Sequence, residues 1–173
     1  MKQKLTLLSG SIFLLSLACA YADHPIPREV RNPNAEPAVF NVEENHQEMR
    51  EAVRRARRSV GQFITALQKH SPDEKDFEVK KPFVQKGHVE HMWLADVTFS
   101  GNRFHGRVDN RPHFIKGLKY GDRVSVNPDE ISDWAYLDHN HLVGGYTIKA
   151  LYNGLSPERR KELEHELTFN IAK

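Results

Sequence analysis

The chain has 173 residues, with 25 Lys and Arg against 23 Asp and Glu, which gives a formal net charge of +2 at pH 7. Residues 1–22 hold two lysines and no acid, so the remaining 151 residues carry 23 charges of each sign. This balance excludes nucleic-acid binding driven by a general surplus of Lys and Arg. The single cysteine, Cys19, excludes a disulfide framework within the chain.

Residues 1–22 are predicted to be a secretory signal peptide. Two lysines precede an apolar run from Leu5 to Leu17, which is shorter than the ~20 residues that a membrane span needs. Ala20-Tyr21-Ala22 places small residues at the −3 and −1 positions of a cleavage site. We therefore expect cleavage after Ala22, a periplasmic or secreted protein, and no membrane span in the mature chain. The alternative is a lipoprotein anchored through Cys19, which follows a small residue.

Residues 23–43 are predicted to be a proline-rich linker, because proline fixes φ and removes a backbone donor. Residues 44–173 are predicted to form a single α+β domain. The first element is a helix over Asn45–His70, with Asn45 and Glu48 as a capping pair. Its apolar residues recur at spacings of three and four, which is typical of one buried helical face: Met49, Val53, Ala56, Val60, Phe63, Ile64 and Leu67.

Four strands are predicted after this helix, over residues 77–84, 90–99, 103–109 and 123–127. Within the second strand, the odd-numbered residues from His91 to Phe99 are expected to share one face. The segment Glu130–Trp134 is predicted to be one turn, and Asp138–Val143 a polar loop.

Two short helices are predicted at the C-terminal end. Gly144–Asn153 fits both a helix and a strand, and the double glycine at its start favours a helix. Ser156-Pro157-Glu158 then provides an N-cap, an N1 proline and an early acid for the last helix. The predicted fold is α+β, with a small antiparallel sheet packed by a long N-terminal helix and one or two short C-terminal helices.

No complete catalytic motif is present in the sequence, and no cofactor is predicted. Zinc requires several ligands that converge on one point, and none of the ten histidines has a standard metal-binding spacing. The alternative is a metal held by Asp138, His139 and His141. In that case the protein would be a metal-assisted hydrolase.

The two tryptophans are interpreted differently. Trp93 stands between Met92 and Leu94, so we expect it in the core. Trp134 is beside Asp133 and a polar segment, which leaves a partly exposed role open. A binding surface is predicted around four residues: His91, Asp133, Trp134 and Tyr146.

Several short segments together resemble a known family. They are Phe77-Glu78-Val79-Lys80, Glu90-His91-Met92-Trp93, Gly121-Asp122, Asp133-Trp134 and Gly144-Gly145-Tyr146-Thr147. In this order and combination they are similar to the YegJ-like family of bacterial proteins, domain of unknown function 2314, over about residues 45–155. The resemblance implies a bacterial origin and a compact α+β domain, and it implies no reaction, cofactor or agreed site.

The sequence therefore favours a non-enzymatic binding or interaction module, because binding residues usually lie on loops that a rigid scaffold holds in place. Its partner, a protein or a small ligand, is not identified by any motif. The alternatives are the metal-assisted hydrolase and an immunity or inhibitor protein.

Overall fold

The computed structural model describes residues 42–69 and 71–171. The predicted signal peptide and most of the predicted linker lie outside these residues. Helix α2 (Val42–Lys69) begins three residues earlier than predicted, so Val42 and Glu43 are helical and Asn45 lies inside the helix rather than at its cap. The helix extends toward the N-terminus because no proline or glycine occurs between Pro37 and Gly61 to stop it.

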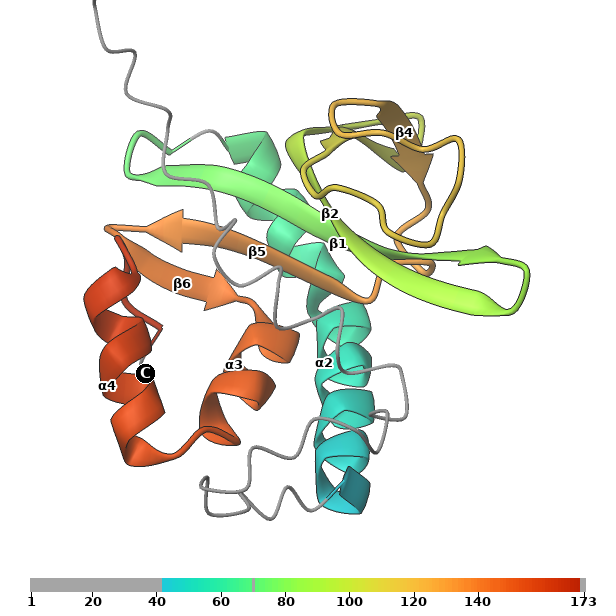
Figure 1. Ribbon diagram of the computed structural model, residues 1–173. Coiled ribbons are helices and arrows are strands. Elements are labelled where there is room, and N and C mark those ends of the chain that lie inside the picture. The colour runs from blue at the N-terminus through green and yellow to red at the C-terminus, as the bar shows by residue number, and fades with distance from the viewer. Residues whose placement is uncertain (1–41, 70, 172–173) are drawn as a thin grey trace, which may run out of the picture.

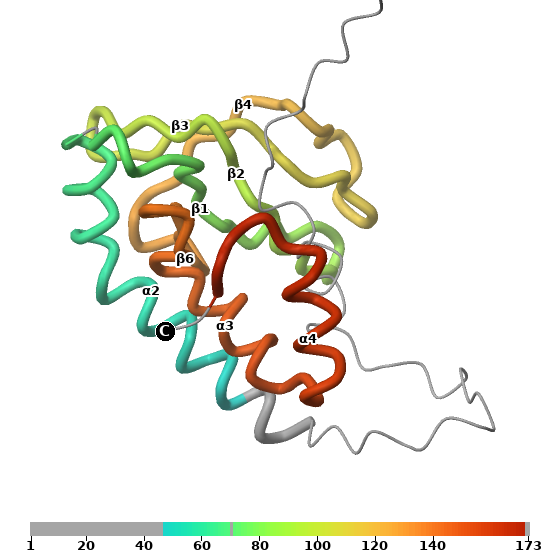
Figure 2. The backbone as a smooth tube through the Cα atoms, turned by 90° about the vertical axis from the view of Figure 1, so that its left-hand side faces the viewer, coloured from blue at the N-terminus to red at the C-terminus, as the bar shows by residue number. Residues whose placement is uncertain are grey.

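Six antiparallel strands form one sheet in the order β4-β3-β2-β1-β5-β6 (Figure 1). Three helices complete the described part of the chain, and α3 lies between α2 and α4 (Figure 2). This arrangement confirms the predicted α+β class. The strands are β1 (Glu74–Gln85), β2 (His88–Ser100), β3 (Arg103–Val108), β4 (Arg123–Val126), β5 (Asp133–Asp138) and β6 (His141–Gly144); the later helices are α3 (Tyr146–Asn153) and α4 (Pro157–Glu166).

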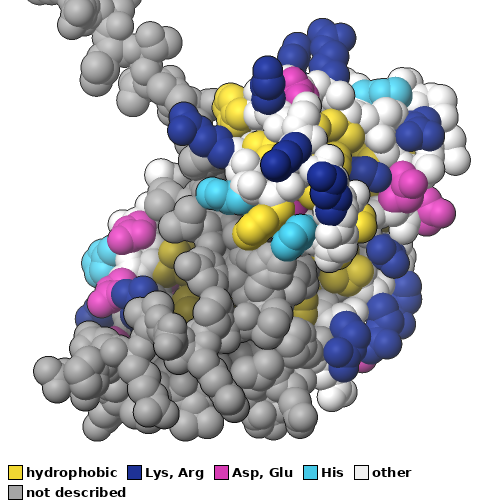
Figure 3. Space-filling view, turned by 45° about the vertical axis from the view of Figure 1, so that its right-hand side comes forward, with side chains coloured by type: hydrophobic (Ala, Val, Ile, Leu, Met, Phe, Trp, Pro, Cys, Tyr) yellow, Lys and Arg dark blue, Asp and Glu magenta, His cyan; other side chains and the backbone are white. Residues whose placement is uncertain are grey.

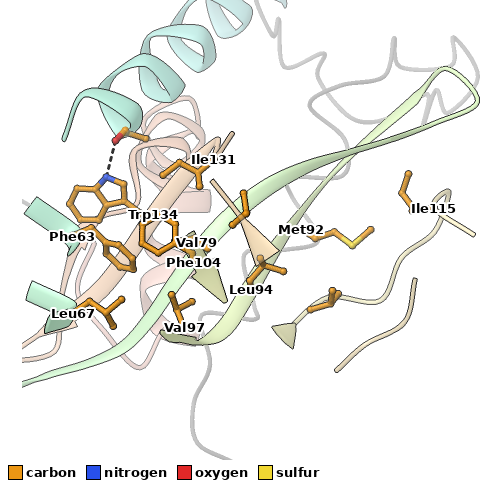
Figure 4. Packing of buried hydrophobic residues seen from close by; sticks show 13 residues of the cluster. Phe63, Leu67, Val79, Met92, Leu94, Val97, Phe104, Ile115, Ile131 and Trp134 are labelled. Atoms are coloured by element: carbon orange, nitrogen blue, oxygen red, sulfur yellow. Dashed lines mark hydrogen bonds between the residues drawn. The ribbon is translucent and has the colours of Figure 1, made fainter. Parts of the chain in front are cut away.

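The main core lies between α2 and one face of the sheet. Phe63 is fully buried and its ring contacts Phe77, Phe104 and Trp134 at centroid distances of 5.4 to 5.7 Å. The indole N–H of Trp134 donates a 2.9 Å hydrogen bond to the carbonyl oxygen of Ala56 in α2 (Figure 4). The apolar face predicted for the helix is therefore the face that packs on the sheet.

A second core covers the opposite face of the sheet. Neighbouring residues of a strand point to opposite faces, so Ala135 and Leu137 face away from α2, whereas Trp134 faces toward it. This core joins β5 and β6 to α3 and to the last described residues; its buried members are Trp93, Ala135, Leu137, Leu142, Ile148, Phe169 and Ile171. The sheet is thus buried on both faces near β5.

Several local predictions were wrong. The odd-numbered residues of β2 do not share one face, because Asp96 adopts a positive φ of 51° and a register shift occurs between Ala95 and Thr98. Such a bulge adds one residue and reverses the facing of those that follow. Glu130–Trp134 was predicted to be a turn and Asp138–Val143 a polar loop, but residues 133–144 form the β5–β6 hairpin, whose turn residues His139 and Asn140 both have positive φ. Gly144, predicted to start a helix, is the last residue of β6, and α3 starts at Tyr146.

The C-terminal residues close one edge of the sheet. Asn170 forms a parallel bridge with His141, its carbonyl oxygen accepts a 2.8 Å hydrogen bond from the amide of Leu142, and its own amide donates to Asn140. The cap predicted for the last helix is confirmed, because the Ser156 side chain accepts a hydrogen bond from the Arg159 amide. No helix in the described ranges is long and apolar enough to cross a membrane.

Candidate functional site

Asp133 is a buried carboxylate that organises the start of α3. Its Oδ2 accepts hydrogen bonds from the amide and the hydroxyl of Thr147, at 2.8 and 2.6 Å, and its Oδ1 accepts from the amides of Trp134 and Tyr146, at 2.9 and 3.1 Å. These contacts satisfy amides that a helix N-terminus leaves without a partner. Burial raises the pKa of Asp133, although the hydrogen bonds from Thr147 and the charge of Lys80 act in the opposite direction. The residue therefore has a structural role.

Lys80 lies between Asp133 and Trp93 on the face of the sheet that points away from α2. It pairs with Asp133 of β5 on one side and with Trp93 of β2 on the other. Its ammonium group is 3.4 Å from the Thr147 hydroxyl and 5.7 Å from the centre of the Trp93 ring. Lys80 and Trp93 are both at least nine-tenths buried. Buried charges of this kind are held by compensating partners rather than offered to a ligand.

The structure does not bring the four predicted binding residues together on one exposed surface. Trp134 is 1% exposed and belongs to the core against α2, so the partly exposed role considered for it is corrected. Tyr146 is half-buried and accepts a 2.9 Å hydrogen bond from Ser59 in α2. His91 is half-buried on the opposite face, with Nδ1 2.8 Å from the hydroxyl oxygen of Ser132, and its binding role stays a prediction.

The alternative metal ligands do not assemble into a site. His139 Nδ1 contacts the Asp138 carboxylate at 2.7 Å, its Nε2 is 3.6 Å from an oxygen of Asp73, and His141 Nδ1 contacts the backbone carbonyl of His139. Across residues 42–69 and 71–171, no group of three or more His, Cys, Asp or Glu side chains could hold a metal ion. Asp138 and Asp73 raise the pKa of His139 through a hydrogen bond and through their charges.

A different part of the molecule has the features of a surface that binds a partner. The β1–β2 hairpin is longer than its neighbours: pairing with β5 ends at Lys80 and pairing with β3 ends at Leu94, while β1 and β2 pair with each other as far as Gln85 and His88. The end of this hairpin therefore projects beyond the sheet as a two-stranded ribbon (Figure 1). An isolated two-stranded hairpin is only marginally stable in water, so this one requires support.

The loop between β3 and β4 supplies that support through Glu90. The Glu90 carboxylate is buried and accepts hydrogen bonds from three consecutive backbone amides, those of His113 at 2.9 Å, Phe114 at 3.0 Å and Ile115 at 3.3 Å. Gln85 adds two reciprocal bonds, donating to the Lys116 carbonyl and accepting from its amide. The ribbon and the loop are thereby fixed as one unit.

We refer to residues 84–89 and 111–116 as the hairpin–loop surface. Three of the four exposed large hydrophobic side chains in the described residues belong to it: Val84 at 71%, Val89 at 36% and Phe114 at 41%. The Phe114 ring stacks on His88 with an interplanar angle of 9°. In Figure 3, which brings this side of the molecule forward, Lys and Arg side chains surround hydrophobic and histidine side chains.

The charge of this surface has one sign. Its twelve residues include three exposed cations, Lys86, Arg111 and Lys116, and no acidic residue. Sequence reasoning missed this surface, because Val84 was assigned to the end of the first predicted strand and Val89 was left outside the second. The signal that could have found it is the apolar pair that flanks the turn Gln85-Lys86-Gly87-His88. The role of Glu90 could not have been found, because its partners are backbone amides more than twenty residues away.

Together these features define an α+β domain with one antiparallel sheet, a buried carboxylate in β5 that holds the start of α3, and a projecting end that carries cations and exposed apolar side chains. The chain belongs to a bacterial family known as DUF2314, described as an uncharacterized protein conserved in bacteria, whose family model matches residues 46–171.

Two relatives support this membership. The chain is 36% identical over 121 residues to the uncharacterized protein YegJ of Escherichia coli K12, covering 70% of this chain and 78% of that protein. It is 31% identical over 141 residues to a Neisseria meningitidis serogroup B protein that is provisionally named an ankyrin repeat protein, covering 77% of this chain and 55% of that protein. No solved structure matches the chain significantly. The family recognised from the short segments is thereby confirmed, and the match extends to residue 171 rather than ending near 155.

Proposed function

We propose that this protein is a non-enzymatic binding module that acts outside the inner membrane through the hairpin–loop surface. The observation that carries the proposal is the gathering of Val84, Val89 and Phe114, all exposed, at one projecting end of the molecule. Clustered exposed apolar side chains mark sites where proteins or membranes bind. The signal peptide predicted in residues 1–22 supports the location.

The rigidity of this surface supports the same function. Glu90 and Gln85 together form five hydrogen bonds to the backbone of residues 113–116. Burial of a carboxylate requires compensating hydrogen bonds, and here the three amides that donate to Glu90 all belong to the loop that displays Phe114. A surface fixed before binding loses less conformational entropy when a partner arrives, which favours affinity.

Site-specific photo-crosslinking in living cells tests the proposal. A photoreactive amino acid is placed at position 84 or 114, and in the matched control at position 161 of α4, where the lysine is also exposed. We expect irradiation to give discrete protein or lipid adducts from positions 84 and 114 and none from position 161. The absence of adducts at 84 and 114, or equal adducts from all three positions, would contradict the proposal.

Cell fractionation tests the location separately. Protein released with the periplasmic fraction and shortened by the length of residues 1–22 supports it, whereas full-length protein confined to the cytosol contradicts it. A toxin captured at position 84 would favour the immunity or inhibitor alternative within the same binding function.

A further inference from the structure

We propose that the partner of the hairpin–loop surface is the headgroup region of an anionic phospholipid bilayer. This inference rests on the proposed function, because it names the partner of the same surface.

The geometry of the ribbon favours lipid over a folded protein. Val84 and Val89 are direct cross-strand partners, so their side chains lie on one face of the ribbon. Glu90, the next residue, points to the other face and holds the loop there, where Phe114 stacks on His88. Exposed apolar side chains therefore occur on both faces of the projecting end. A flat protein partner covers one face of such a ribbon, whereas the interfacial region of a bilayer surrounds it.

The charge of the surface indicates which lipid. Lys86 lies at the turn of the ribbon, and Arg111 and Lys116 lie at the two ends of the segment 111–116 within the supporting loop. With no acidic residue in these twelve positions, the surface attracts phosphate groups of anionic lipids. A Lys or Arg close to such a membrane strengthens binding by about fivefold. The apolar side chains supply the part of the attraction that salt does not screen.

A fluorophore attached at the ribbon tests the inference. In a Cys19→Ser background of the full chain, Val84→Cys carries an environment-sensitive label, and Lys161→Cys carries the same label as the control. Vesicles contain phosphatidylcholine alone or phosphatidylcholine with phosphatidylglycerol. We expect a blue shift at position 84 only with phosphatidylglycerol present, and none at position 161. Because both proteins carry the same residues 1–22, membrane attachment by that segment cannot produce the difference.

Two triple variants with equal net charge separate this surface from a general charge effect. Lys86→Ala, Arg111→Ala and Lys116→Ala together should weaken vesicle binding by about 100-fold. The control replaces three exposed arginines of α2, Arg50→Ala, Arg55→Ala and Arg58→Ala, and should change binding by less than about fivefold. Thermal melts of all variants should coincide with that of the parent protein, since the replaced side chains are exposed.

The outcomes distinguish the inference from the proposed function. No shift at position 84 with either vesicle, or an equal loss of binding in both triple variants, overturns the lipid inference. If the label shows no blue shift with vesicles while the crosslinker at position 84 captures a protein in cells, the lipid inference is wrong and the proposed function stands. If the label at position 84 shows no shift and the crosslinker gives no adduct at position 84 or 114, both fall.

Discussion

Replacing Glu90 by Gln tests whether one buried carboxylate orders the hairpin–loop surface. The substitution keeps the shape of the side chain but replaces one acceptor oxygen by an NH2 group. Because both oxygens of Glu90 accept from backbone amides, at 2.9 Å for one and at 3.0 and 3.3 Å for the other, any orientation of the substituted glutamine side chain places a donor against a donor. Hydrogen bonds to a charged group contribute ~1.5–3 kcal/mol each, and a buried donor without a partner costs ~1–3 kcal/mol.

The expected loss is therefore ~2–4 kcal/mol in the free energy that keeps the loop closed. This corresponds to amide hydrogen exchange about 30 to 1,000 times faster at residues 113–115. The measurement is exchange resolved by NMR or mass spectrometry under native conditions. Urea unfolding should show a smaller or equal loss of global stability, because Ile115 also packs in the main core.

The matched control is Glu130→Gln. Glu130 is exposed and its carboxylate accepts a 3.0 Å hydrogen bond from the Asn127 amide within a turn, so the same chemical change occurs where water can replace the lost bond. The Glu130→Gln substitution should change the exchange rate of the Asn127 amide by less than about threefold, as for an ordinary surface hydrogen bond. If the amides of residues 113–115 kept their protection in folded Glu90→Gln protein, the loop would be held by its apolar contacts, and the role assigned to the carboxylate would be refuted.

Three further predictions concern the scaffold. Trp134→Ala should lower the free energy of unfolding by ~3–5 kcal/mol in urea titrations, because the ring is buried and its N–H bonds to α2; a loss below ~1 kcal/mol would place the ring outside the core. Gly144→Ala should cost at least ~2 kcal/mol by the same measurement, since a Cβ there would lie 2.4 Å from the ring and carbonyl of Trp134 and the backbone has a φ of 71°. His139 should titrate above its ordinary pKa in NMR spectra, so its small contribution to the free energy of unfolding is present at low pH and is lost as the pH rises through the folded pKa. Asp138→Asn should lower the pKa of His139, and an unchanged titration would show that the contact between His139 and Asp138 is absent in solution.

Much of the fold was predictable because it follows from local chemistry. The helical face of α2 was visible as apolar residues at spacings of three and four, and the start of α4 was visible as Ser156 followed by Pro157. Gly144 and Gly145 also predicted the start of α3, and both have positive φ. The structure adds that Gly144 is required by contact with Trp134, which lies on the neighbouring strand of the same hairpin. The local glycine pattern predicted helix α3, and the contact with Trp134 explains why position 144 is a glycine.

The β5–β6 hairpin was missed because its turn is polar. Asp138-His139-Asn140-His141 has the composition of a solvent-exposed loop, but Asn tolerates a left-handed backbone conformation, and the turn of a tight hairpin requires two such residues in succession. The error also affected the predicted site. Once residues 133–138 are a strand, Trp134 points toward α2 and Asp133 points away from it, so the two cannot belong to one surface.

The engagement of β6 by Asn170 has a consequence for self-association. Outer strands of a sheet offer free backbone groups on which other polypeptides can polymerise, and the C-terminal segment occupies that position beside β6. The other outermost strand of the six, β4 at the far side, is only four residues long and is followed at once by Asn127-Pro128. So short a strand offers few backbone groups for another chain to pair with. The two outermost strands of the sheet are therefore protected against edge-to-edge aggregation in different ways, β6 by the C-terminal segment and β4 by its length.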